Sequence, residues 1–163
     1  MHKFLQMLCI ILSLNSIQIL SQPVQQKDYL SLSTAVFDFL QEERPSLEVR
    51  VEYKMSSIDW AFKPFTGVMT NTDGAINFFA GLFKDFQITS FLYFTPSFAP
   101  SIYYKHKSKD LYFLLEFRSG FELTARFDND VRAGISFFHV SNASLGELNP
   151  GVESLAITYY LPL

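Results

Sequence analysis

The sequence predicts an all-β protein, an eight-stranded antiparallel transmembrane β-barrel whose interior is filled by side chains. Apolar and polar residues alternate along the chain, the alternation recurs in eight segments separated by turn residues, and a largely apolar segment precedes them all. Charged residues make up only 18% of the chain, against a usual value of roughly a quarter, and hydrophobic residues make up 48%. This composition excludes a disordered or collagen-like chain.

The first 21 residues are predicted to be a signal peptide that is removed. Lys3 gives the segment a basic start, residues 4–20 are largely apolar, and Ser21 is a small residue at the expected cleavage point. A membrane anchor is the alternative, but polar residues interrupt a run that falls short of the roughly 20 apolar residues a spanning helix needs. The only cysteine, Cys9, lies in this segment, so residues 22–163 contain no thiol for a disulfide, a nucleophile or a metal site.

Four strands are predicted in the first half of the mature chain. Residues 47–54 show the pattern most clearly, because apolar side chains occupy one parity and Glu, Arg and Lys occupy the other. The segments 29–40, 60–70 and 75–84 fit the same template. Turns are predicted between these strands at residues 41–45, 56–59 and 71–74.

Four more strands are predicted in the second half. Residues 113–127 place large apolar side chains on one face and Glu and Arg on the other. The segments 88–104, 131–141 and 153–163 follow the same period of two, with turns predicted at 85–87, 105–110 and 128–130 and a longer loop at 142–152. No linker or second composition interrupts the series, so residues 22–163 are predicted to form one domain.

Such strands suit either a soluble barrel or sandwich with its apolar face inside, or a membrane barrel with that face outside. The polar parity favours the membrane barrel, because acidic and basic residues alternate on it as if to pair across a closed interior. Eight tilted strands of nine to eleven residues need about 72 to 88 residues, which the mature chain provides. The charged residues predicted to face inward are Glu48, Glu52, Glu116, Glu122, Arg50, Lys54, Arg118, Arg126 and Arg132.

The signal peptide and the apolar outer face predict a bacterial outer membrane. An even number of strands places both termini in the periplasm, so the 128–130 turn lies there and the long 142–152 loop lies outside. The chain has 13 basic and 16 acidic residues, a net charge of −3 and no evident basic cluster, so nucleic acid is not an expected partner.

Three polar residues stand out near the outer end of the last two strands. His139 and Ser141 share the parity of Phe137, and Glu153 shares the parity of Leu155 on the next strand, so all three are expected on the outer wall. A hydroxyl, an imidazole and a carboxylate are the groups that acyl transfer needs. A His-x-Ser pair at a strand end is more often interfacial polarity, and Glu153 could be a solvated loop residue. Polar groups on a lipid-facing wall are nevertheless costly and call for a functional account.

The segments that carry these residues also resemble a known family. The residues of 139–143 (His-Val-Ser-Asn-Ala), 149–151 (Asn-Pro-Gly) and 153–154 (Glu-Ser), followed by a closing strand, resemble the C-terminal signature of the PagL-type lipid A 3-O-deacylases. These are bacterial outer-membrane enzymes also known as acyloxyacyl hydrolases. Residues 71–75, 95–100 and 115–120 resemble the same family, and the similarity covers most of 60–163.

The resemblance implies a role for each of the three residues. Ser141 is expected to be the nucleophile, His139 the general base and acid, and Glu153 the residue that orients the imidazole. The family's enzymes need no metal or organic cofactor, so none is expected here.

The resemblance also implies supporting residues in the loop between the last two strands. Asn149 matches an asparagine whose side chain helps form the oxyanion hole, and Asn142 matches a further asparagine important to activity. Ser144 stands where many members carry glycine, so a positive φ there would strain the serine while keeping its backbone N–H.

The expected function is therefore that of an outer-membrane serine esterase that removes an ester-linked acyl chain from lipid A, at the 3-position. The expected partners are lipopolysaccharide and outer-membrane lipids, with the chain a monomer or homodimer and its site at the outer-leaflet side. Two alternatives remain open at this point. One is a non-enzymatic structural or adhesion barrel in the outer membrane, and the other is a soluble lipocalin-like binder.

Overall fold

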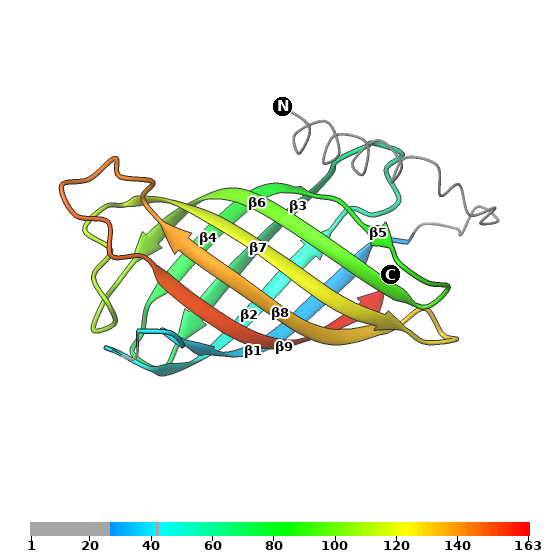
Figure 1. Cartoon of the computed structure of the whole chain (residues 1–163), viewed down its shortest axis with the longest axis horizontal. Helices are drawn as coiled ribbons and strands as arrows, with labels where there is room; N and C mark the ends of the chain where they lie inside the picture. Colours follow the sequence, from blue (N-terminus) through cyan, green and yellow to red (C-terminus); the bar gives the residue numbers. More distant parts are fainter. Residues whose placement is uncertain (1–26, 42) are drawn as a thin grey trace, which may run out of the picture.

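The computed structural model describes residues 27–41 and 43–163, and within them the chain folds into a single antiparallel β-barrel (Figure 1). The predicted signal peptide, residues 1–21, lies outside the described residues. No helix in the described part is long and apolar enough to cross a membrane. The strands are β1 (Tyr29–Phe37), β2 (Ser46–Lys54), β3 (Lys63–Asn71), β4 (Ile76–Phe83), β5 (Phe86–Gln87), β6 (Leu92–Tyr104), β7 (Leu115–Arg126), β8 (Arg132–Ser141) and β9 (Val152–Pro162).

Eight long strands form the barrel wall in the order β4-β3-β2-β1-β9-β8-β7-β6, and an antiparallel pairing of β4 with β6 closes the ring. The first and last strands pair along their whole length, with Tyr29 opposite Pro162 and Phe37 opposite Ser154. The two-residue strand β5 pairs only with β6, close to one end of the barrel. The predicted fold class, an eight-stranded antiparallel barrel, is confirmed.

The alternation of burial along the strands shows which face points inward. On β2 the apolar side chains are 37–57% exposed, whereas the charged side chains between them are at most 2% exposed. A soluble protein shows the reverse arrangement, with its charges in water and its apolar residues inside. An apolar outer wall around a charged interior is the arrangement of a transmembrane barrel.

Charged and aromatic side chains together fill the interior. Arg118 forms an ion pair with Glu52 at 2.5 Å, and its guanidinium carbon lies 4.0 Å from the ring centre of Phe138. Arg50 pairs with Glu48 and stacks on the same ring at 3.8 Å. Buried apolar residues from several strands surround these pairs, among them Phe37, Phe65, Met69, Phe79, Phe83 and Val140.

The pairing of the interior charges differs from the sequence prediction at two residues. Glu116 is fully buried, and neither of its carboxylate oxygens has a hydrogen-bond partner among the described residues. Arg126 lies at the barrel rim, where it donates to the Ser90 carbonyl at 3.3 Å instead of pairing inside. The parity of a residue along its strand predicts whether its side chain points into the barrel or out of it. Whether an opposite charge is close enough to pair depends instead on the position of the residue along the barrel axis.

Several strands are shorter than the sequence pattern predicts. The predicted strand 29–40 stops at Phe37, because Asp38 adopts a positive φ of 59°. The predicted strands 60–70 and 88–104 begin at Lys63 and Leu92, and the predicted turn 85–87 contains β5. In each case the apolar residues continue beyond the hydrogen-bonded part of the strand, because residues at the barrel rims are apolar too.

The loops divide the barrel into two ends. Residues 38–41 and 43–45 and the loops 72–75, 105–114 and 142–151 gather at what we call the site end. Loops 55–62, 84–91 and 127–131 gather at the opposite end, called the terminal end, where the Leu163 N–H donates to the Asp28 carbonyl at 2.9 Å. In Figure 1 the long loop between β8 and β9 projects from the site end, and the C-terminus lies at the other.

Candidate functional site

The register of β8 and β9 brings His139 and Glu153 together. The two residues are direct cross-strand partners, and the His139 Nδ1 atom lies 2.9 Å from Glu153 Oε1. Both side chains lie on the outer wall, where that of His139 is 40% exposed and that of Glu153 is 13% exposed. A proton on Nδ1 donated to the carboxylate leaves Nε2 free to accept a proton from another group.

Ser141 is the last residue of β8 and lies on the same outer face as His139, two residues further along the strand. Its neighbours Val140 and Asn142 point inward and are buried, which fixes the half-buried Ser141 on the wall. Among the described residues, the Ser141 hydroxyl makes no hydrogen bond. The structure therefore joins His139 to Glu153 by a hydrogen bond and leaves the hydroxyl of Ser141 without one. Catalytic hydrogen bonds are often long or absent in enzymes that have no substrate bound.

The chain turns sharply immediately after Ser141. Ala143 and Ser144 have positive φ angles of 52° and 62°, and the Leu145 N–H donates to the Asn142 carbonyl at 3.0 Å. Ser144 thus occupies the left-handed conformation in which glycine is the unstrained residue. The backbone N–H groups of Ala143 and Ser144 have no partner in the described part of the chain. Successive free N–H groups in a turn of this kind form a concavity that can bind an anion.

Two asparagines hold this turn in place. The Asn149 Oδ1 atom accepts from the Asn142 N–H at 3.0 Å. The buried Asn142 side chain donates to the carbonyls of Leu111 at 3.1 Å and Leu148 at 2.7 Å, which ties the loop to its neighbour after β6. Within the described ranges, the Asn149 amide nitrogen makes one long hydrogen bond, 3.5 Å to the Ser144 hydroxyl. Asn142 and Asn149 therefore fix the shape of the loop, and the amide nitrogen of Asn149 remains nearly free beside the turn.

Gly151 presses its backbone against the imidazole. Its φ is 64°, and a Cβ atom at this position would lie 2.8 Å from His139 Cε1. Gly151 belongs to the Asn-Pro-Gly motif, but no role for it was predicted from the sequence. The close approach limits how far the His139 ring can swing.

Three residues from elsewhere in the chain extend the site, and none of them was predicted from the sequence as a site residue. Gln41 Nε2 donates to the Pro150 carbonyl at 3.0 Å and lies 3.5 Å from Glu153 Oε2. Gln41 Oε1 accepts from Lys109 at 2.7 Å, and Lys109 pairs at 2.8 Å with the buried Asp38. No local motif marks these residues, because only closure of the barrel brings the loops after β1 and β6 to the start of β9.

The arrangement supplies the groups for acyl transfer: a hydroxyl, an imidazole held by a carboxylate, and a turn with free N–H groups. A family model described as lipid A 3-O-deacylase (PagL) matches residues 34–162, a range that includes all six predicted site residues. The chain belongs to the lipid A 3-O-deacylase (PagL) family.

Solved structures agree on the fold of this PagL-family chain. The crystal structure of the outer membrane enzyme PagL superposes with a TM-score of 0.67 at 16% sequence identity, covering 83% of this chain and 99% of that one. A de novo designed transmembrane β-barrel gives a TM-score of 0.58 at 7% identity, covering 86% and 100%. No curated protein sequence matches the chain. At these identities the structural likeness establishes the fold, and the family assignment comes from the family model.

Proposed function

We propose that this chain is an outer-membrane serine esterase that hydrolyses the acyl ester at the 3-position of lipid A, with Ser141, His139 and Glu153 as its catalytic triad. The observation that carries the proposal is the 2.9 Å contact between His139 and Glu153 on the outer wall, with Ser141 on the same face, in a chain of the PagL family. Intact lipopolysaccharide is the expected substrate.

In the first half of the reaction, the Ser141 oxygen forms a bond to the ester carbonyl carbon while its proton passes to His139 Nε2. The carbonyl oxygen becomes an oxyanion, which the Ala143 and Ser144 N–H groups and the Asn149 amide stabilise. The bond to the sugar oxygen then breaks, and His139 returns the proton to that oxygen. Glu153 keeps the imidazole oriented and stabilises its charged form.

In the second half, water hydrolyses the acyl-enzyme. His139 removes a proton from the water as its oxygen attacks the acyl carbon, and the bond to Ser141 breaks as that oxygen takes the proton back. The products are a free fatty acid and a lipid A with one acyl chain fewer. The chemistry requires only protein side chains, backbone N–H groups and water.

The position of the triad suits a substrate that stays in the membrane. Because the triad lies on the outer wall, a glycolipid in the surrounding leaflet can bring its ester to Ser141 by moving sideways. We place the site end at the outer leaflet, where lipopolysaccharide resides. This placement agrees with the predicted signal peptide at residues 1–21, and it puts Asp28 and Leu163, which meet at the terminal end, on the periplasmic side.

Mass spectrometry of lipid A tests the proposal directly. Purified protein in detergent is incubated with lipopolysaccharide, and the expected product has lost one ester-linked acyl chain. The Ser141→Ala protein should give no product, while its heat-dependent gel mobility shows that the barrel is intact. An unchanged lipid A mass with the wild-type protein, or full activity of Ser141→Ala, would contradict the proposal and favour a non-enzymatic barrel.

A further inference from the structure

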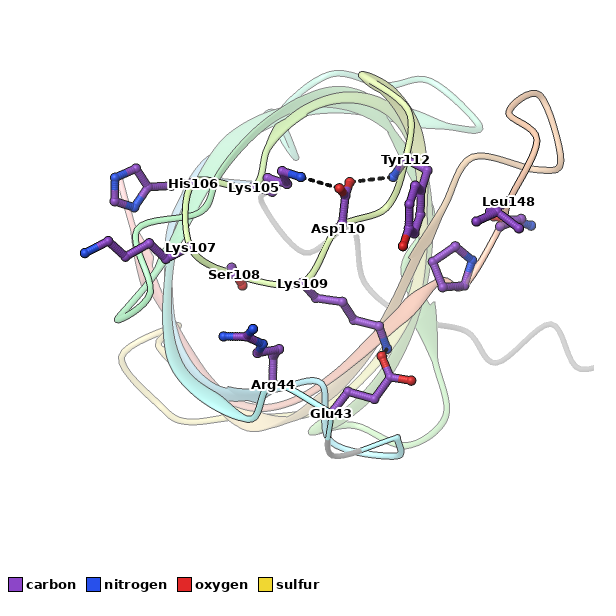
Figure 2. A pocket seen from close by; sticks show the side chains of 12 residues that line it. Glu43, Arg44, Lys105, His106, Lys107, Ser108, Lys109, Asp110, Tyr112 and Leu148 are labelled. Atoms are coloured by element: carbon purple, nitrogen blue, oxygen red, sulfur yellow. Dashed lines mark hydrogen bonds and ion pairs between the residues drawn. The ribbon is translucent and has the colours of Figure 1, made fainter.

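A pocket of about 970 Å³ opens at the site end of the barrel. Figure 2 shows it from close by, with lining side chains from the loops after β1, β6 and β8. Asn149 and Pro150 belong to its lining, so the pocket is continuous with the loop that shapes the candidate active site. A concavity of this size can enclose much of a small organic ligand or of a sugar headgroup.

Four basic residues, Arg44, Lys105, Lys107 and Lys109, line the pocket. Lys105 forms an ion pair with Asp110, and its hydrogen bond holds the pKa of the Asp110 carboxyl below the usual value, so that carboxylate stays charged. Lys109 is buried and pairs with Asp38 at 2.8 Å. These two lysines are therefore occupied by carboxylates of the protein itself.

Arg44 and Lys107 remain available. Both side chains are exposed, and no carboxylate of the described residues forms an ion pair with either. In Figure 2 they extend away from Lys109 and Glu43, toward the left of the view. No basic cluster was expected from the sequence, yet three of these four residues lie within the five-residue segment 105–109. Arg44 comes from a different loop and joins them only when the barrel closes.

The pocket wall is also connected to the triad by side-chain contacts. Lys109 donates to Gln41, and Gln41 in turn contacts Pro150 and Glu153. A ligand bound among the pocket loops therefore lies against the same framework that holds the catalytic carboxylate. Such an arrangement suits a ligand whose polar part occupies the pocket while its ester lies at Ser141.

We propose that this pocket binds a phosphate group of the substrate's sugar headgroup, with Arg44 and Lys107 as its cationic partners. The identity of the ligand rests on the proposed function, since lipid A is a phosphorylated glucosamine disaccharide. Arginine presents paired N–H donors that match phosphate oxygens, and lysine adds a compact positive charge. The pocket then determines how tightly the glycolipid binds, whereas the triad determines how fast its ester is cleaved.

Binding without turnover tests the inference. The full-length Ser141→Ala protein in detergent micelles is titrated with lipid A that carries its phosphates and with the same lipid A after enzymatic removal of them. Adding Arg44→Ala and Lys107→Ala together should weaken binding of the phosphorylated form about tenfold and leave binding of the dephosphorylated form unchanged. Equal weakening of both forms, or of neither, would overturn the inference.

A matched control removes two basic residues from the terminal end. Lys84→Ala combined with Arg126→Ala changes the net charge by the same amount, so unchanged binding there attributes the effect to the pocket and not to overall charge. Equal weakening in this control would overturn the pocket assignment. Gel mobility and circular dichroism verify that each barrel is folded before it is titrated.

Inorganic phosphate separates a headgroup site from a site for the free ion. If the pocket takes the headgroup, excess inorganic phosphate displaces little phosphorylated lipid A, because the free ion lacks the lipid's other contacts. Complete displacement would overturn the headgroup assignment in favour of a free-phosphate site. Since these measurements involve no hydrolysis, wild-type protein that binds but fails to deacylate lipopolysaccharide would refute the proposed function and leave the pocket supported.

Discussion

At the scale of single residues, the site depends on backbone positions as much as on side chains. Gly151→Ala tests this, because φ is 64° and the new Cβ atom would lie 2.8 Å from the His139 ring. We expect the deacylation rate to fall at least about tenfold and the free energy of unfolding to fall by about 1 kcal/mol. Rate assays on lipopolysaccharide and thermal unfolding in detergent measure the two effects.

Gly74→Ala provides a matched control for this change. Gly74 has a φ of 84°, and its added Cβ atom would lie 2.7 Å from the His106 ring, away from the triad. The control should lose similar stability and keep its maximal rate. A comparable loss of maximal rate in both variants would show that general strain, and not displacement of His139, is responsible.

Gln41 is expected to position the triad through its contacts with Pro150 and Glu153. Gln41→Ala should lower kcat about fivefold, which corresponds to the roughly 1 kcal/mol of one hydrogen bond, and should leave KM unchanged. Gln87→Ala removes the same kind of side chain at the terminal end and should have no effect. An altered KM with normal kcat would instead place Gln41 in substrate binding.

The pH dependence of the rate tests the role of His139 as general base. A protonated imidazole cannot accept the Ser141 proton, so kcat/KM should be lower in acid than at neutral pH. Rates are measured between pH 5 and 8, with gel mobility recorded at each pH. A flat profile over that range in a folded barrel would exclude His139 as the base.

At the scale of elements, the sequence predicted all eight long strands but not their ends. Charged and apolar residues of β2 alternate without a break, and the structure buries one set and exposes the other. Phe39 and Trp60 continue the apolar pattern beyond the ladder because the rims are apolar as well. The pattern of alternation does not mark Asp38, where the chain adopts a positive φ of 59° and the carboxylate pairs with Lys109 from a distant loop.

The same reasoning explains which site residues were predictable. Parity placed His139 and Ser141 on one face, and the structure pairs His139 with Glu153 on the adjacent strand. Gln41 and Lys109 were not predictable, because single-strand periodicity contains no information on which loops meet at the barrel mouth. Residues of one strand can be assigned from sequence, whereas contacts between distant loops require the closed ring.

The loop between β8 and β9 offers a test that separates two roles of Asn149. Asn149→Asp keeps the oxygen that accepts from the Asn142 N–H but removes the amide N–H donors. If Asn149 stabilises the oxyanion, kcat should fall about 100-fold or more in Asn149→Asp, as in Asn149→Ala. Thermal unfolding should show Asn149→Asp to be the more stable of the two. Full activity of Asn149→Asp would leave the residue a role in loop shape alone.

At the scale of the whole molecule, the barrel combines a charged interior with an outer wall that carries the proposed triad. Arg118 shows how the interior holds together, since it pairs with Glu52 and lies over the Phe138 ring. Removing one partner of a buried ion pair leaves an uncompensated charge, whereas replacing both partners with apolar residues is often close to neutral. The triad does not contact these charges, so stability and activity should separate.

Arg118→Met should therefore lower the free energy of unfolding by about 3 kcal/mol, measured by urea titration of the barrel in detergent. The double variant Arg118→Met with Glu52→Leu should recover part of this loss, because no charge is then left without its partner. Both proteins should deacylate lipopolysaccharide at the wild-type rate in the absence of urea, since the outer wall is unchanged. A single variant as stable as the wild type would mean that Lys54, which lies 3.5 Å from Glu52, compensates that carboxylate alone.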